Sequence, residues 1–171
     1  ETRLVHSFDQ GHMISGYGAM AWLYWRTGQP EAALKLAERV TAIVFKSLPT
    51  SYYSHPGCVY VTELYLALWE QGTNNEYAAI AQKMCKQLRA LARPFPVAAG
   101  AAWRCTGHSY QLEGNLDAAR SAWQKGLESA QSMGMVYEQA LILQHLGNAG
   151  DRNYAAQAAM LFDKLGIKMR D

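Results

Sequence analysis

Apolar residues recur along most of the chain at spacings of three and four positions, and alternation with a period of two is almost absent. In the segment 75–93, for example, Ile80, Met84 and Leu88 fall within one arc of a helix, whereas Lys83 and Lys86 fall on the opposite arc. This spacing is typical of amphipathic α-helices, whose apolar side packs while the charged side faces water. The pattern therefore predicts an all-α protein.

The breaks between the periodic segments have the chemistry of tight turns. The segment TGQPE at 27–31 ends one helix with Gly28 and begins the next with Pro30 in its first turn. Similar turns are expected around Gly72, Gly114 and Gly147, with looser connections between the hairpins that these turns define. The expected helices form four hairpins: 13–26 with 30–46, 58–71 with 75–92, 96–113 with 116–133, and 135–148 with 152–165.

The turns recur every 33 to 44 residues, a period that indicates a helical repeat array in which each hairpin buries a face against the next. The third hairpin carries the most specific signal, because its aromatic and small residues have the spacing of the tetratricopeptide repeat (TPR). In such repeats, small residues lie where paired helices cross closely, and aromatic residues fill the gaps between pairs. The residues at these positions are Trp103, Gly107, Tyr110, Ala119, Trp123 and Gly126.

Three segments carry a family resemblance: LYWRTGQPEAAL near the start, EGNLDAARSAWQKGLESAQSMGMVYEQALILQHLG in the middle and AMLFDKLGI near the end. Together they resemble the C-terminal TPR-like regions of multidomain bacterial signalling proteins, over about residues 11–167. The resemblance implies a right-handed superhelix of four hairpins, attached in such proteins to a STAND-type ATPase and to a class III adenylate cyclase, a kinase or a LuxR-type DNA-binding domain. We expect one domain over 1–171, with 1–10 as an N-terminal extension, excised from a larger protein.

The segment GYGAMA at 16–21 raises a competing interpretation, because it has the glycine spacing of a dinucleotide-binding loop. Such a loop needs a buried strand just before it, and the preceding residues HSFDQGHMIS are too polar for one. The favoured interpretation places both glycines on the first helix of a hairpin, where they permit close approach of another helix. No cofactor is therefore expected.

Composition and charge exclude several other classes of function. The net charge of +2 is too small to indicate a nucleic-acid partner, and no apolar run is long enough for a membrane helix, so we expect a cytoplasmic protein. The three cysteines are far apart, which favours reduced cysteines packed as small hydrophobic residues. The five histidines have no metal-ligand spacing, and no residue set suggests an enzyme.

The remaining candidate site is the concave groove, which the resemblance places along the first helix of each hairpin. The residues assigned to it by position are Trp22, Trp25, Arg26, Thr62, Leu66, Trp69, Arg104, His108, Gln111, Tyr137 and Gln144. Tryptophans beside arginines are typical of interface anchors, although the same tryptophans could pack between hairpins. The leading hypothesis is a non-catalytic protein-interaction or regulatory module that binds a peptide, a partner domain or another domain of its own chain. The alternative is a sensor in which Trp22, Trp25 and Trp69 stack on a small ligand.

Overall fold

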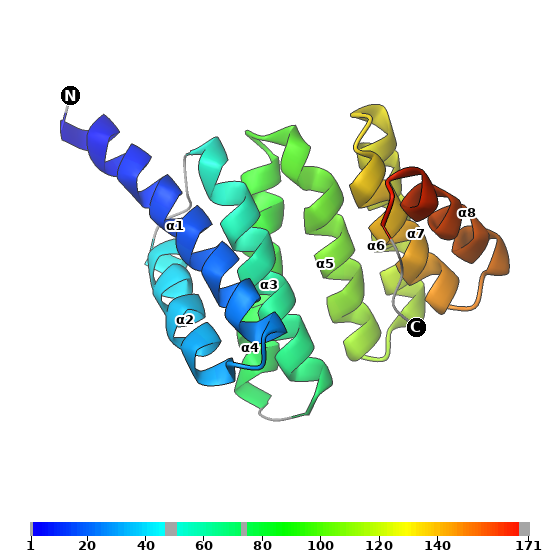
Figure 1. Ribbon diagram of the computed structural model, residues 1–171, viewed down its shortest axis with the longest axis horizontal. Helices are drawn as coiled ribbons and strands as arrows, with labels where there is room; N and C mark the ends of the chain where they lie inside the picture. The colour runs from blue at the N-terminus through cyan, green and yellow to red at the C-terminus, as the bar shows by residue number, and fades with distance from the viewer. Residues whose placement is uncertain (1, 47–50, 73–74, 168–171) are drawn as a thin grey trace. The chain divides into compact units, whose positions relative to one another are not determined.

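The chain folds into helical hairpins, seen in the computed structural model of Figure 1. The structure describes residues 2–46, 51–72 and 75–167, with side chains from residue 10 onward except that of residue 75. Within these ranges there are eight α-helices, two short 3-10 helices and no β-strand, so the all-α prediction is confirmed. The α-helices are α1 (Thr2–Arg26), α2 (Pro30–Lys46), α3 (His55–Glu70), α4 (Asn75–Ala92), α5 (Ala99–Leu112), α6 (Leu116–Ser132), α7 (Val136–Asn148) and α8 (Arg152–Lys164). The 3-10 helices are η1 (Tyr52–Ser54) and η2 (Pro96–Ala98).

Consecutive helices pair as antiparallel hairpins, α1 with α2, α3 with α4, α5 with α6 and α7 with α8, as predicted and consistent with a TPR-like array. Each hairpin turn contains a glycine with positive φ, a backbone conformation that residues with a Cβ rarely adopt. These turn glycines are Gly28, Gly72, Gly114 and Gly150, with φ angles of 76°, 67°, 80° and 106°.

The fourth turn, predicted over 147–151, differs from the other three in one detail, which concerns its first glycine, Gly147. That residue lies inside α7, and a Cβ atom added to it would lie 2.8 Å from the backbone of Ala155 in α8. Gly147 therefore permits close contact between the two helices of the hairpin, and Gly150 makes the turn. A glycine in a helix and a glycine in a turn look alike in sequence when they are three residues apart.

The chain divides into two compact units, Glu1–Phe95 and Pro96–Asp171. The first unit contains α1 to α4 and the second contains α5 to α8, so each unit consists of two hairpins. The single domain and the superhelical course expected for the whole chain stay predictions. Each unit is described separately below.

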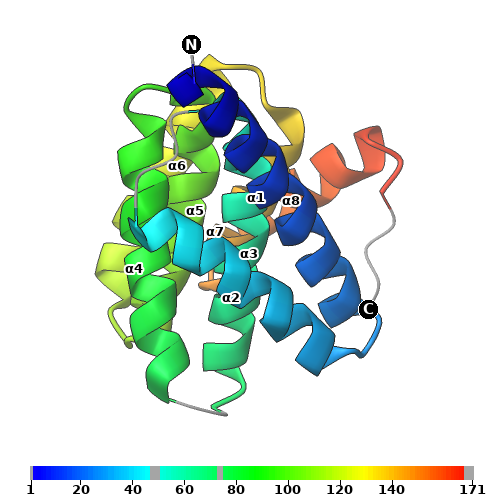
Figure 2. The ribbon, with the colours of Figure 1, turned by 90° about the vertical axis from the view of Figure 1, so that its left-hand side faces the viewer.

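In the first unit, α1 contacts both α2 and α3 (Figure 2). Two glycines meet in the contact with α3, where a Cβ atom added to Gly18 would lie 2.5 Å from Cα of Gly57. Because neither residue has a side chain, the two backbones can meet directly. The expected role of Gly18 in close helix approach is confirmed, whereas Gly16 has no atom of another residue near its Cβ position.

The first helix is longer than predicted, because it begins at Thr2 rather than at residue 13. Gly11 lies inside this helix and is buried, and a Cβ atom added to it would lie 2.7 Å from Oγ of Ser51. The contact shows that the helix packs on the segment before α3 well ahead of its predicted start. Residues 2–10, expected as an extension, thus continue α1.

In the second unit, the core is built around Trp123 of α6, which is fully buried. Its indole Nε1 lies 3.2 Å from the backbone oxygen of Arg104 in α5, to which it donates a hydrogen bond. A Cβ atom added to Gly107 would lie 2.2 Å from that Nε1, so the indole occupies the space that the glycine leaves open. Gly107 thus lies where the paired helices α5 and α6 meet closely, as predicted for a small residue at this repeat position.

Candidate functional site

A pocket of about 740 Å³ opens in the first unit beside the turn between α1 and α2. Residues from all four helices of the unit contribute to it, together with the turn itself. A volume of this size lies within the range of about 300–1,000 Å³ that is typical of ligand pockets. The lining residues are Trp25, Arg26, Gly28, Pro30, Leu34, Leu68, Gln71 and Tyr77.

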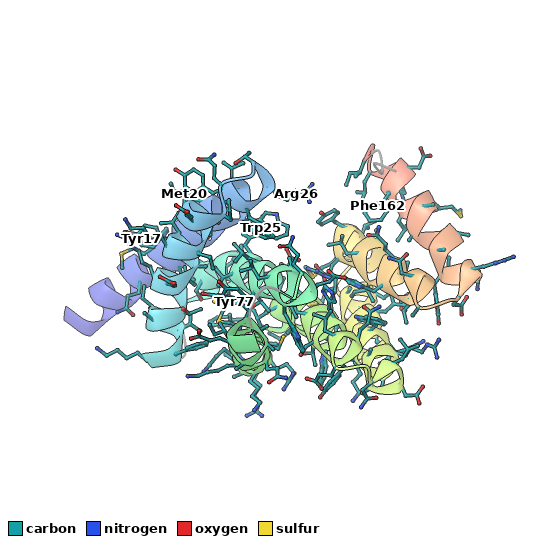
Figure 3. All side chains as sticks on the ribbon, turned by 90° about the horizontal axis from the view of Figure 1, so that it is seen from below. Tyr17, Met20, Trp25, Arg26, Tyr77 and Phe162 are labelled. Atoms are coloured by element: carbon teal, nitrogen blue, oxygen red, sulfur yellow. The ribbon has the colours of Figure 1, made fainter. Side chains whose placement is uncertain are left out.

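The turn positions two of these residues, Trp25 and Arg26, at the C-terminal end of α1 (Figure 3). The backbone N–H of Gly28 donates to the oxygen of Trp25 at 3.2 Å, and that of Gln29 donates to the oxygen of Tyr24 at 2.9 Å. This pair of hydrogen bonds around a glycine of positive φ is the Schellman motif, which ends the helix at a defined residue. The end of α1 therefore presents Trp25 and Arg26 from a fixed backbone.

The chemistry of the pocket is apolar with one positive charge. Among the described residues, Arg26 is the only charged one that lines it, and Gln71 adds an uncharged donor and acceptor. The Arg26 guanidinium carbon lies 5.9 Å from the centre of the Trp22 ring, a cation–π contact that restricts the side chain. Trp22 in turn stacks on Tyr60 of α3, with ring centres 6.5 Å apart. The arrangement suits an apolar group that carries a hydrogen-bond acceptor.

The structure separates the groove residues assigned to the first unit. Trp22 and Trp25 are half-buried and Arg26 is exposed, and Trp25 and Arg26 line the same pocket. Trp69 is half-buried but does not line the pocket. Thr62 and Leu66 are 0% and 1% exposed, so neither side chain offers accessible surface in this structure. The Thr62 hydroxyl instead donates to the oxygen of Cys58 at 2.7 Å within α3.

The groove residues assigned to the second unit lie in a different environment. Arg104 is buried, and its Nε atom donates a hydrogen bond to Oε1 of Glu138 in α7 at 2.5 Å. The ion pair holds the Arg104 side chain inside the unit. By its predicted groove position, the same side chain would face a partner. His108, Gln111 and Gln144 are half-buried, and Tyr137 is 53% exposed with its ring edge on Phe162.

His145 of α7 was not among the predicted groove residues. It lies beside His108 and Trp123 in the second unit. Its ring stacks on Trp123 at 5.2 Å and lies 5.2 Å from the ring of His108. Burial lowers the pKa of His145 to about 3, and the nearby His108 and Arg104 act in the same direction. His145 is therefore neutral at physiological pH, and it contributes packing there rather than charge.

The remaining candidates for chemistry are the cysteines and the side chains that could bind a metal ion. Cys58, Cys85 and Cys105 are buried and form no disulfide, as expected for reduced cysteines packed in the core, and burial raises the pKa of Cys58 to about 12. Among the residues that the structure describes, no group of three or more His, Cys, Asp or Glu could hold a metal ion. In the same ranges no helix is both long and apolar enough to cross a bilayer.

Sequence reasoning missed most of the pocket wall, namely Pro30, Leu34, Leu68, Gln71 and Tyr77. Assignment by position considered only one face of the first helix in each hairpin, whereas the pocket lies at the turn and uses both helices of both hairpins. The available signal was the TGQPE turn itself, because it fixes the end of α1 beside the start of α2.

Comparison with known proteins assigns no family: no protein-family model, curated protein or solved structure matches the chain. The class of protein is therefore defined by the fold alone, as an all-α protein of eight α-helices in sequential hairpins over the described residues. The resemblance to the repeat regions of bacterial signalling proteins stays a prediction.

Proposed function

We propose that the chain is a non-catalytic protein-interaction module, and that Trp25 and Arg26 anchor a peptide or domain of the partner. The observation that carries the proposal is the pocket of about 740 Å³ whose wall contains both residues. Tryptophan and arginine are enriched among the residues that contribute most to binding at protein interfaces, especially beside pockets that exclude water. The partner is a protein, or another domain of the same polypeptide, located in the cytoplasm.

The partner group that enters the pocket is apolar, because Leu34, Leu68 and the rings of Trp25 and Tyr77 make up half of the lining residues. A carboxylate or carbonyl oxygen of the partner then accepts a hydrogen bond from the Arg26 guanidinium. The fixed end of α1 reduces the conformational entropy that binding would otherwise cost.

A capture experiment tests this proposal. The chain is immobilised as wild type, as Trp25→Ala and as Arg26→Glu, and each form is exposed to the same bacterial lysate. Met133→Ala serves as the matched control, because Met133 is 45% exposed but lies in the second unit. We expect a protein that wild type and the control retain and that both pocket variants lose. Equal retention by all four forms would contradict the role of the pocket.

A second candidate function, a small-ligand sensor, is favoured by the size of the same pocket. In that case a ring-containing metabolite stacks on Trp25, and its binding stabilises the folded chain. A ligand at 100 times its Kd raises the free energy of unfolding by about 2.7 kcal/mol, so a thermal-shift panel of metabolites detects it. A shift that Trp25→Ala removes and Met133→Ala keeps supports the sensor, whereas no shift across the panel supports the protein partner.

A further inference from the structure

The exposed side of α1 carries no charged residue of its own between residues 10 and 25, although the guanidinium carbon of Arg39 in α2 lies 5.7 Å from the centre of the Tyr17 ring. Residues 10–25 contain no Asp, Glu, Lys or Arg, although Met13, Met20 and Leu23 are 40%, 45% and 59% exposed. Tyr17 and Met20 are seen on the outer side of the helix in Figure 3. In a repeat array, a helix face that contacts water is normally polar. This side of α1 therefore has the composition of a surface that another element covers.

The hairpin turns give a register that identifies the covering element. Gly28 and Gly72 have the same left-handed conformation, and Met20 and Leu64 each lie eight residues before their turn glycine. Met20 is 45% exposed in α1, whereas Leu64 is fully buried in α3. The same repeat position is thus open in the first hairpin and covered in the second.

The element that covers this position in α3 is the preceding hairpin. Met13 and Gly57 are also equivalent, each fifteen residues before the turn glycine. Gly57 meets the backbone of Ile14 in α1, where an added Cβ atom would clash with the main chain. Because Gly57 and Leu64 are seven residues apart, they lie on one side of α3, the side toward α1. The exposed side of α1 is therefore where a preceding hairpin would lie.

The helix α8 has a corresponding stretch without charge, which the exposed Asp163 and Lys164 border one turn beyond Met160. Residues 153–162 contain no Asp, Glu, Lys or Arg, and Met160 is 72% exposed. Ala156 and Ala159 are exposed beside it on the same side of the helix. Small residues beside a single large apolar residue leave room for another helix to approach closely.

In the register of the turns, this surface of α8 corresponds to the part of α6 that contacts the next hairpin. Gln124 and Met160 each lie ten residues after the turn glycine, and Nε2 of Gln124 donates to the hydroxyl of Tyr154 in α8 at 3.0 Å. Trp123 and Ala159 are likewise equivalent, and Trp123 stacks on a ring of α7. The exposed side of α8 is therefore where a following hairpin would lie.

We propose that the chain associates head to tail with a second copy of itself, so that the exposed side of α8 in one copy covers the exposed side of α1 in the next. The α1 face consists of Met13, Tyr17, Met20 and Leu23, and the α8 face consists of Ala156, Ala159 and Met160. In the register of the turns, the α1 face corresponds to a surface that a preceding hairpin covers, and the α8 face corresponds to a surface that a following hairpin covers. The proposed contact therefore repeats the stacking of hairpins within each unit. Because the two faces differ, the interface is heterologous, so copies add head to tail rather than pairing one face with itself.

Two charge variants test this association. Met20→Glu places a carboxylate in the α1 face, and Met160→Glu places one in the α8 face. Ser121→Glu is the matched control, because Ser121 is exposed on α6 outside both faces. Sedimentation equilibrium over a range of protein concentrations measures the average mass, and circular dichroism checks that each variant keeps its helices.

We expect the masses of wild type and Ser121→Glu to rise with concentration beyond that of a dimer. Each face variant alone should associate at least about tenfold more weakly, because the contact would bury an unpaired carboxylate. An equimolar mixture of the two variants should form a dimer and nothing larger, since only one intact α1 face and one intact α8 face remain in each pair. This recovery distinguishes a heterologous contact from a symmetric one.

A wild-type mass that stays at the monomer value over the whole range would overturn the proposal. So would a mixture of the two variants that stays monomeric while wild type associates, because the contact would then use one face on both copies or neither face. The result is independent of the proposed function, since neither face contains a residue of the Trp25 pocket.

Discussion

The guanidinium of Arg104 and the carboxylate of Glu138 form a buried ion pair between α5 and α7, with Nε and Oε1 2.5 Å apart. The two residues are 6% and 8% exposed, so water screens the pair very little. Burying either charge alone is strongly unfavourable, and each group therefore depends on the other for its place in the core. The pair fixes the spacing of two helices that belong to successive hairpins.

This relationship predicts the effect of removing one partner. Glu138→Leu should lower the free energy of unfolding by about 3–5 kcal/mol, because the arginine would remain buried without its carboxylate. The double variant Arg104→Met with Glu138→Leu should recover a large part of that loss, since two apolar side chains can pack in the same space. Urea unfolding of both variants and of wild type measures the difference, and a double variant less stable than Glu138→Leu would contradict the assignment.

The two neighbouring glycines of α1 should respond to alanine in opposite directions. Gly18→Ala should destabilise the first unit by about 1–3 kcal/mol or more, because the new Cβ would lie 2.5 Å from backbone atoms of Gly57. Gly16→Ala should stabilise it by about 0.5–1 kcal/mol, since no atom lies within 4 Å and alanine favours a helix. Thermal unfolding at low protein concentration measures both, and equal shifts would count against the α1–α3 contact.

The depressed pKa of His145 predicts a loss of stability in acid. Well above pH 6.5 the ring is neutral in both the folded and the unfolded chain, so it contributes no pH dependence there. Between pH 6.5 and about 3 the unfolded chain binds a proton that the folded chain does not, and the free energy of unfolding falls by up to about 1.4 kcal/mol per pH unit.

The variant His145→Phe checks this prediction, because it keeps a ring against Trp123 and removes the titration. Its free energy of unfolding should change less steeply than that of wild type when urea denaturation is repeated between pH 6 and pH 4. Parallel pH profiles for the two proteins would show that His145 takes up its proton equally well in both states.

The buried cysteines should be unreactive while the chain is folded. Cys58, Cys85 and Cys105 are all buried, and the raised pKa of Cys58, about 12, leaves very little thiolate at pH 8. An aromatic disulfide reagent should therefore modify none of the three within the time that suffices for complete reaction in urea. Rapid reaction of even one thiol in the absence of urea would indicate that its helix opens readily.

The sequence predicts the secondary structure and the hairpin pairing because both depend on local signals. The spacing of apolar residues identifies a helix, and the glycine in a turn such as TGQPE identifies its end. The start of α1 could not be predicted in the same way, because Gly11 in a polar segment resembles a break. Its contact with Ser51 explains the continued helix, and that contact involves a residue forty positions away.

The candidate site was predicted only in part for the same reason. Trp25 and Arg26 could be singled out because an aromatic residue beside a cation is recognisable in sequence. Tyr77 and Leu68 join them in the pocket only because α3 and α4 fold back onto the turn. Arg104 appeared suitable for a surface by position, and nothing near it in the sequence indicates that Glu138, in another hairpin, would engage it.

The placement of Trp123 gives the second unit an internal spectroscopic reporter. It is the only fully buried tryptophan of the five, all of which the structure describes, and the others are half-buried. Its indole is held between the gap at Gly107 and the ring of His145, so separation of the two hairpins would expose it to solvent and shift its emission to longer wavelength. The opening of this half of the molecule can therefore be followed by fluorescence without an attached dye.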